Sequence, residues 1–138
     1  MEIEEGVHER RSVRRPQLIL VADDVDDVRT LWGAYLRMWG FEIAEARNGY
    51  EAVELAKISM PAAILMDFSM PGLDGAHAAQ LIRKHPRLQR VPVVGITAHT
   101  SAALDEFRAS CDAVLYKPVP PDTLLDTLRS VMRESATP

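Results

Sequence analysis

The chain has 138 residues, 47% of them hydrophobic and 26% charged, which suits one globular domain with a buried core. Its 20 acidic and 16 basic residues give a formal net charge of −4, a balance that argues against a dedicated nucleic-acid binder. The single cysteine, Cys111, excludes an internal disulfide and a zinc site of the usual cysteine type, and no apolar stretch approaches the roughly 20 residues that cross a bilayer. We therefore expect a cytoplasmic protein with neither nucleic acid nor a membrane as its partner.

Residues 1–15 differ in character from the rest of the chain. They contain four Glu and four Arg, show no hydrophobic periodicity and end before Pro16. They also lack the apolar segment of a secretory signal peptide. We expect a flexible N-terminal arm over residues 1–15 and one domain over residues 16–138.

Five short apolar runs predict buried β-strands. The second run is interrupted by Glu42 and Glu45, so we expect that strand at one side of the sheet. The strands are expected at residues 17–22, 41–46, 62–66, 91–97 and 113–116.

A helix is predicted after each strand. The first carries apolar residues from Val28 to Trp39 at intervals of three and four, and Asp26 and Asp27 are expected to cap its start. Asn48 is expected to cap the second helix, which should run to Lys57. The remaining helices are expected around residues 78–82, over residues 101–109, and from residue 121 or 122 onward.

Strands and helices thus alternate along the domain, and the strands are apolar throughout rather than alternately apolar and polar. This pattern is typical of parallel strands that are covered on both faces and joined by right-handed crossovers. The predicted fold class is therefore α/β, a doubly wound five-stranded parallel sheet in a three-layer (βα)5 sandwich. Ligands of such sheets bind beyond the carboxyl ends of the strands, where the strand order changes direction.

Chemically active side chains lie at the ends of four of the five predicted strands. Asp23 and Asp24 follow the first strand, Asp67 follows the third, Thr97 ends the fourth, and Lys117 follows the fifth. Three carboxylates at one edge of a sheet repel one another, and a divalent cation such as Mg²⁺ relieves that repulsion. A metal, a lysine and a hydroxyl around one carboxylate suit phosphoryl transfer, with that carboxylate, for which Asp67 is the best candidate, as the nucleophile.

Four sequence segments carry a strong resemblance to a known family. They are Val-Ala-Asp-Asp at residues 21–24, the Asp-x-x-Met-Pro-x-x-Asp-Gly pattern within residues 64–75, Ile-Thr-Ala at residues 96–98 and Tyr-Lys-Pro at residues 116–118. In their order and spacing, residues 16–134 resemble a response-regulator receiver domain of the chemotaxis-regulator (CheY-like) type, whose fold is flavodoxin-like. The resemblance implies a two-component signalling protein that takes a phosphoryl group from a phosphohistidine of a histidine kinase or a histidine phosphotransfer protein.

The resemblance also implies a role for each acidic residue. Asp67 would be the phosphoacceptor, and Asp67 and Asp24 would bind Mg²⁺ directly. The backbone carbonyl of Ser69 would be a third protein ligand, and Asp23 would act mainly through a metal-bound water.

The remaining site residues would contact the phosphoryl group. Lys117 would pair with the phosphoryl oxygens, and Thr97 would move in to donate a hydrogen bond to them. The peptide bond between Lys117 and Pro118 would be cis, as it is in the family.

The chain departs from the family at one position. Receivers commonly carry Tyr or Phe three residues before the lysine, and this ring turns inward when the threonine moves. Here that position is Val114, and an aromatic residue, Tyr116, stands next to the lysine instead. The usual coupling between the threonine and the aromatic ring therefore has no standard partner in this sequence.

Several functional hypotheses remain open. The first is a stand-alone receiver whose output is partner binding, through the face made by the fourth helix, the fifth strand and the fifth helix. Others are a receiver excised from a hybrid histidine kinase and a phosphorylation-independent scaffold. A haloacid-dehalogenase-like phosphatase is less favoured, because those enzymes generally need an acid two residues after the nucleophile, where this chain has Ser69. We expect no enzymatic activity beyond self-phosphorylation and autodephosphorylation.

Overall fold

The computed structural model describes residues 15–98, 102 and 104–136. The five strands are β2 (Leu18–Ala22), β3 (Glu42–Ala46), β4 (Ala63–Asp67), β5 (Val93–Thr97) and β6 (Ala113–Tyr116). The five helices are α2 (Asp26–Met38), α3 (Gly49–Ser59), α4 (Gly75–Lys84), α5 (Leu104–Ser110) and α6 (Pro121–Ala136). Of the predicted N-terminal arm, residues 1–14 lie outside the described residues.

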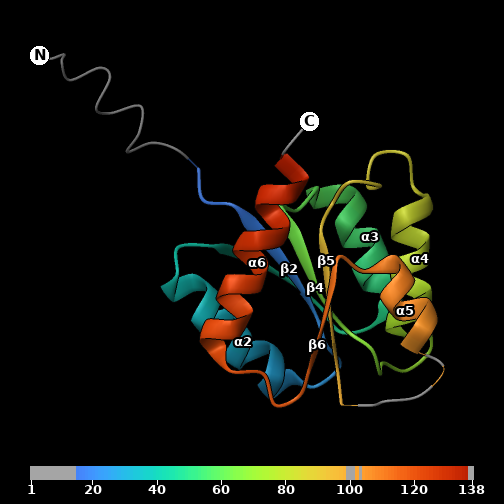
Figure 1. Cartoon of the computed structure of the whole chain (residues 1–138), viewed down its shortest axis with the longest axis horizontal. Helices are drawn as coiled ribbons and strands as arrows, with labels where there is room; N and C mark the ends of the chain where they lie inside the picture. The colour runs from blue at the N-terminus through green and yellow to red at the C-terminus, as the bar shows by residue number, and fades with distance from the viewer. Residues whose placement is uncertain (1–14, 99–101, 103, 137–138) are drawn as a thin grey trace, which may run out of the picture.

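All neighbouring strands are parallel, and their order in the sheet is β3-β2-β4-β5-β6 (Figure 1). The chain first adds β3 on one side of β2 and then places β4 on the other side, so the strand order changes direction between β2 and β4. The carboxyl ends of these two strands therefore form the point where doubly wound sheets bind their ligands. The predicted α/β fold class is confirmed, and the strand interrupted by glutamates is at an edge of the sheet.

Two hydrophobic layers cover the sheet, because successive residues of a strand point to opposite faces. On one face, Leu20, Ile64 and Met66 pack against buried residues of α3, α4 and α5. On the other face, Ile19 and Leu65 pack against buried residues of α2 and α6. Figure 1 shows the resulting three layers, with α2 and α6 on one side of the sheet and α3, α4 and α5 on the other.

The helix starts bear out one capping prediction and correct another. The side chain of Asn48 accepts a hydrogen bond of 2.9 Å from the amide of Glu51, so this predicted cap of α3 is confirmed. The prediction that Asp26 and Asp27 cap α2 is wrong, because Val25 occupies the cap position and no side chain there accepts a capping hydrogen bond. The carboxylate of Asp26 pairs instead with Arg29, one turn further along the helix. Among the described residues, no helix is long and apolar enough to span a membrane.

Candidate functional site: an acidic cluster beside a lysine

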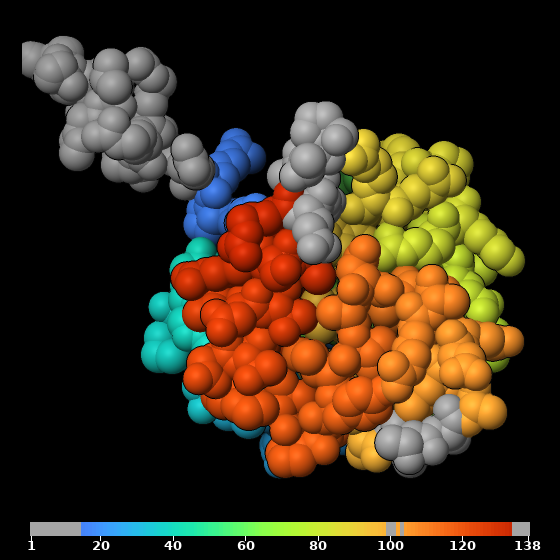
Figure 2. Space-filling model, in the orientation of Figure 1, coloured from blue at the N-terminus to red at the C-terminus, as the bar shows by residue number. Residues whose placement is uncertain are grey.

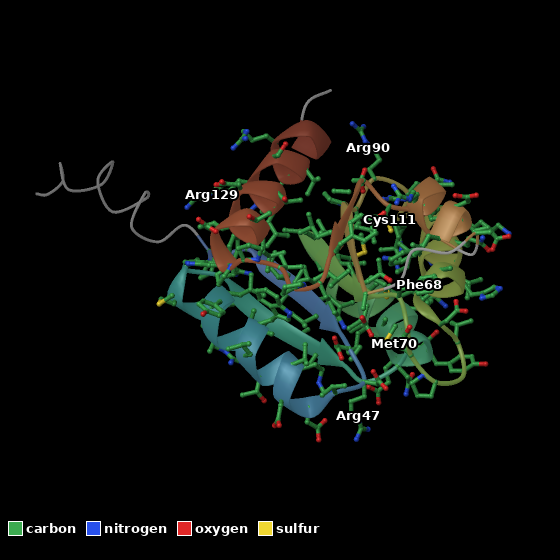
Figure 3. All side chains as sticks on the ribbon, turned by 60° about the horizontal axis from the view of Figure 1, so that its bottom comes forward. Arg47, Phe68, Met70, Arg90, Cys111 and Arg129 are labelled. Atoms are coloured by element: carbon green, nitrogen blue, oxygen red, sulfur yellow. The ribbon has the colours of Figure 1, made fainter. Side chains whose placement is uncertain are left out.

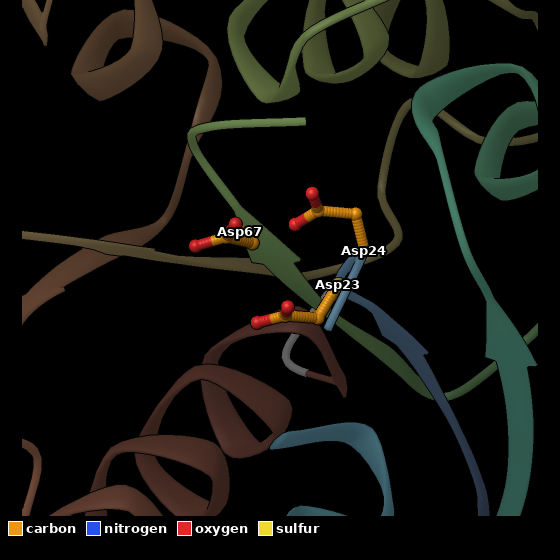
Figure 4. Close-up of side chains that lie close together, drawn as sticks. All are labelled: Asp23, Asp24 and Asp67. Carbon is orange, nitrogen blue, oxygen red and sulfur yellow. The ribbon is translucent and has the colours of Figure 1, made fainter. Parts of the chain in front are cut away.

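Three aspartates meet where the strand order changes direction. Asp67 is the last residue of β4, and Asp23 and Asp24 directly follow β2, which pairs with β4. One carboxylate oxygen from each of the three lies within 4.8 Å of the others (Figure 4). Asp23 and Asp67 are buried, whereas Asp24 is exposed to solvent. The structure therefore brings the three aspartate side chains together, as the sequence predicts.

A lysine that follows the edge strand β6 reaches the same cluster. Lys117 follows β6, and its Nζ lies 3.1 Å from Oδ1 of Asp67. Its backbone amide donates a hydrogen bond of 2.8 Å to the carbonyl of Thr97, which anchors the start of the following loop to the end of β5. The peptide bond between Lys117 and Pro118 is cis, as expected. Thr97 itself is buried at the end of β5.

The electrostatics of the cluster are unfavourable without a cation. Burial, followed by the charge of Asp23, raises the pKa of Asp67 from an ordinary 3.8 to about 6, although Lys117 acts in the opposite direction. Burial also raises the pKa of Asp23, against a hydrogen bond from the amide of Val25 and the charge of Lys117. One lysine therefore leaves negative charge uncompensated at the centre of the site.

The Asp-Gly pair at residues 74 and 75 holds the loop between β4 and α4 in place beside the cluster. Asp74 caps α4, because its Oδ1 accepts a hydrogen bond of 2.9 Å from the amide of His77. A Cβ atom on Gly75 would stand only 2.2 Å from the carbonyl oxygen of Asp67, so only glycine allows α4 to start this close to the phosphoacceptor candidate. The Asp-Gly pair thus fixes the loop against β4.

The middle of this loop forms an open hollow beside the acidic cluster. The hollow has a volume of about 440 Å³, and Asp24, Ser69 and Asp74 contribute to its walls. Phe68 and Met70 lie in the loop on the side of α4 and α5 (Figure 3), where the ring of Phe68 stands 5.1 Å from that of Phe107 in α5. The exposed position of Ser69 leaves its part of the loop open to a ligand.

Val114, the residue that departs from the family pattern, packs against the hydrophobic core. Val114 is half-buried against the hydrophobic layer that includes Phe107. Tyr116 is 39% exposed, and the guanidinium carbon of Arg108 lies 5.3 Å from the centre of its ring. The aromatic residue of β6 therefore lies at the surface beside α5, two residues closer to Lys117 than the family pattern puts it.

This arrangement fits a divalent metal ion. Three carboxylates supply hard oxygen atoms within reach of one ion, and the exposed Asp24 leaves room for water on the remaining coordination positions. A cation would also offset the repulsion that raises the pKa values of Asp23 and Asp67.

Comparison with known proteins agrees with this geometry. Residues 19–129 match the family model of the response regulator receiver domain. The chain belongs to the response regulator receiver domain family. It is 34% identical over 119 residues to the transcriptional regulatory protein SrrA of Staphylococcus aureus, covering 85% of this chain and 48% of SrrA. The receiver therefore spans about half the length of that curated relative.

Solved receiver structures resemble it in fold. The chemotaxis protein CheY4 of Vibrio cholerae is 29% identical with a TM-score of 0.78, and the match covers 84% of this chain and 98% of that one. The receiver domain of the sensor histidine kinase PA1611 from Pseudomonas aeruginosa is 31% identical with a TM-score of 0.80, over 86% of this chain and 98% of that one. The PA1611 receiver has a magnesium ion coordinated in its active-site cleft.

One residue next to the site was missed from the sequence. Arg29 is buried in α2 and reaches the backbone of Asp23. The signal that would have found it is its position, three residues before Trp32 and seven before Leu36 on the buried stripe of the helix. A charged residue at a core position of an amphipathic helix needs partners, and here they are the carboxylates of Asp26 and Glu45 together with the carbonyl of Asp23.

Proposed function

We propose that this receiver accepts a phosphoryl group on Asp67 from a phosphohistidine of a histidine kinase or phosphotransfer protein, with Mg²⁺ bound beside it. The observation that carries the proposal is the position of Asp67: a buried carboxylate, within reach of two further carboxylates, with the Lys117 ammonium 3.1 Å away. These are the groups needed to hold a cation and to neutralise a phosphoryl group at one nucleophile.

The transfer needs an ionised acceptor. Above a pH of about 6 the Asp67 carboxyl is deprotonated, and one of its oxygens attacks the phosphorus atom. A phosphorus–oxygen bond forms while the phosphorus–nitrogen bond breaks, and the electron pair of the broken bond returns to the imidazole of the donor. Lys117 then neutralises charge on the phosphoryl oxygens, and the hydroxyl of Thr97 donates a hydrogen bond to one of them.

Asp24, Asp67 and the carbonyl of Ser69 would hold the ion, with Asp23 acting through a bound water. The ion would supply positive charge to the phosphoryl oxygens during transfer. We propose that the site performs this transfer and the later hydrolysis of the aspartyl phosphate, in which water takes the phosphoryl group as inorganic phosphate, with no turnover of a separate small substrate. The residue two positions after Asp67 supports this, because Ser69 offers a hydroxyl where an aspartate-nucleophile phosphatase needs a second acid.

The output of the switch would be partner binding through α5, β6 and α6. These three elements lie next to one another on the face shown in Figure 2. Tyr116 is exposed there and is adjacent in sequence to Lys117, so a change at Asp67 has a short route to this surface. With a kinase or phosphotransfer protein as the donor, the exchange would take place in the cytoplasm.

Intact-mass measurement after incubation with acetyl phosphate and Mg²⁺ tests the proposal. Wild-type protein should gain one phosphoryl group, and the gain should disappear with EDTA or in Asp67→Asn. If acetyl phosphate gives no adduct, the same measurement with a phosphohistidine donor follows, and failure of both donors contradicts the proposal.

A further inference from the structure

A buried arginine connects three elements around the acidic cluster. Arg29 is only 7% exposed, although charged side chains are seldom buried unless they are paired. Its Nη1 donates a hydrogen bond of 2.8 Å to the carbonyl of Asp23, and its Nε donates one of 3.1 Å to Glu45 in β3. Its Nη2 pairs with the carboxylate of Asp26 in the first turn of α2. The three donors of one rigid guanidinium thus bind the site loop, the edge strand and the helix.

The hydrogen bond from Arg29 to the carbonyl of Asp23 affects the orientation of both Asp23 and Asp24. The carbonyl of Asp23 belongs to the peptide unit that joins Asp23 to Asp24, and a planar peptide unit turns as a whole. On the other side of Asp23, its amide donates a hydrogen bond of 3.1 Å to the carbonyl of Ala46. The backbone of Asp23 is therefore held at both of its peptide groups, and this sets the directions in which Asp23 and Asp24 project.

The charge of Arg29 is already matched by other residues. Glu45 and Asp26 supply two carboxylates to the guanidinium, and neither belongs to the cluster around Asp67. Arg29 therefore contacts the site through the neutral carbonyl of Asp23 rather than as a counter-ion to the aspartate side chains. A lysine at this position has a single nitrogen and lacks the planar fork that reaches three acceptors.

We propose that Arg29 is a positioning residue of the phosphorylation site, which fixes the Asp23–Asp24 peptide so that both carboxylates face Asp67 and the bound cation. The inference rests on the proposed function, because it concerns the cation that the acidic cluster would hold. Groups behind the ligands of a metal site commonly change its affinity by about 10- to 100-fold when they are replaced.

The test is Mg²⁺ binding by isothermal titration calorimetry at pH 8, for wild type, Arg29→Gln and Arg29→Lys. Loss of a nearby positive charge by itself would tighten cation binding, so charge and position predict opposite signs for Arg29→Gln. We expect Mg²⁺ binding to weaken by about 10-fold or more in Arg29→Gln, and by a smaller factor in Arg29→Lys, whose longer side chain keeps one charged donor nitrogen for the carbonyl of Asp23. Arg37→Gln is the matched control, because Arg37 is an exposed arginine in the same helix, and its Mg²⁺ affinity should stay within about twofold of wild type.

A second readout separates positioning from general damage to the fold. Phosphorylation by acetyl phosphate should need more Mg²⁺ in Arg29→Gln, and its rate should return toward the wild-type rate at saturating Mg²⁺. Folded Arg29→Gln protein that binds Mg²⁺ as tightly as wild type, or more tightly, would overturn the inference. So would the loss of cooperative thermal unfolding in both Arg29 variants, because the inference requires a folded chain with misplaced carboxylates.

The outcomes also separate this inference from the proposed function. If wild-type protein neither binds Mg²⁺ nor becomes phosphorylated, the proposed function fails. If wild-type protein does both and the Arg29 variants match it, only the role of Arg29 fails.

Discussion

Asp67 is placed where its charge is costly to the fold and, in the proposed function, useful to the reaction. It is 5% exposed and close to two other carboxylates, and the ion pair with Lys117 does not fully compensate for this. The pKa of Asp67, raised to about 6, reflects the net result: compared with the unfolded chain, the folded chain favours the neutral form of this carboxyl. A carboxylate in this position is ready to interact with a cation or a neutralising partner as soon as it ionises.

Replacing the charge should therefore stabilise the metal-free protein. Because the pKa of Asp67 rises from 3.8 to about 6 on folding, its favourable contribution is complete below the lower value and is lost as the pH rises through 6. Relative to wild type, the free energy of unfolding of Asp67→Asn should rise by about 2 kcal/mol between pH 4 and pH 7.5. Urea unfolding in EDTA measures this, with the exposed Asp126→Asn as a control that should show no such pH-dependent gain.

Lys117 should matter for transfer and not for holding the cation. Lys117→Met removes the ammonium 3.1 Å from Asp67, so we expect phosphorylation by acetyl phosphate to slow by about 100-fold. Loss of a positive charge next to a cation site should leave Mg²⁺ affinity equal to that of wild type or higher. Mg²⁺ affinity that falls together with the rate would mean that Lys117 acts by holding the site together instead.

At the scale of elements, the close approach of α4 to the end of β4 controls the site loop. This approach depends on Gly75, whose missing side chain leaves room for the carbonyl of Asp67. The carbonyl of Phe68, the next residue, accepts a hydrogen bond of 2.9 Å from the amide of Gly75. The loop that carries Ser69 is thus held at both ends.

A methyl group at position 75 should disturb this arrangement. Gly75→Ala places a Cβ atom 2.2 Å from backbone oxygen, so α4 or β4 must move, and we expect a loss of about 2 kcal/mol in the free energy of unfolding. Gly33→Ala is the matched control, because in α2 the added atom meets only the flexible end of Arg37 at 3.3 Å. Chemical denaturation should show Gly33→Ala equal to wild type or more stable, since alanine favours a helix over glycine.

Sequence patterns predict the elements well where burial is uniform. The strands β4 and β5 are buried along their whole lengths, and their apolar runs locate them within two residues. The stripe of α2 also includes Leu31, which is exposed, because periodicity shows which residues share a side of a helix but not how wide the buried strip is. Position at a helix start predicts that Asp26 caps α2, but position alone does not show that its carboxylate pairs with Arg29 instead of with a free amide.

At the scale of the whole molecule, the sheet order brings the site together. Pairing of β2 with β4 places Asp23 and Asp24 next to Asp67. The sequence predicted this convergence, since residues after parallel strands meet at one edge. It did not predict the support behind the site: the position of Arg29 on the stripe of α2 indicates burial, but its partners, Glu45 and the Asp23 carbonyl, are set by tertiary packing.

Cation binding should couple the site to the stability of the whole domain. Mg²⁺ competes with the proton on Asp67, so its affinity should be full above pH 7 and weaken about tenfold per pH unit well below the raised pKa of about 6. Thermal unfolding should therefore show a Mg²⁺-dependent rise in Tm at pH 7.5 that shrinks at pH 5. A rise of equal size at both pH values would mean that the cation binds elsewhere.

The position of the phosphoryl group decides most directly whether Asp67 is the phosphoacceptor. The protein is phosphorylated with acetyl phosphate and Mg²⁺, reduced with borohydride to convert an aspartyl phosphate into homoserine, and mapped by peptide mass spectrometry. We expect homoserine at position 67 alone, and only in samples that contained Mg²⁺. Homoserine at Asp23 or Asp24, or a phosphoryl group that persists in Asp67→Asn, would contradict this assignment.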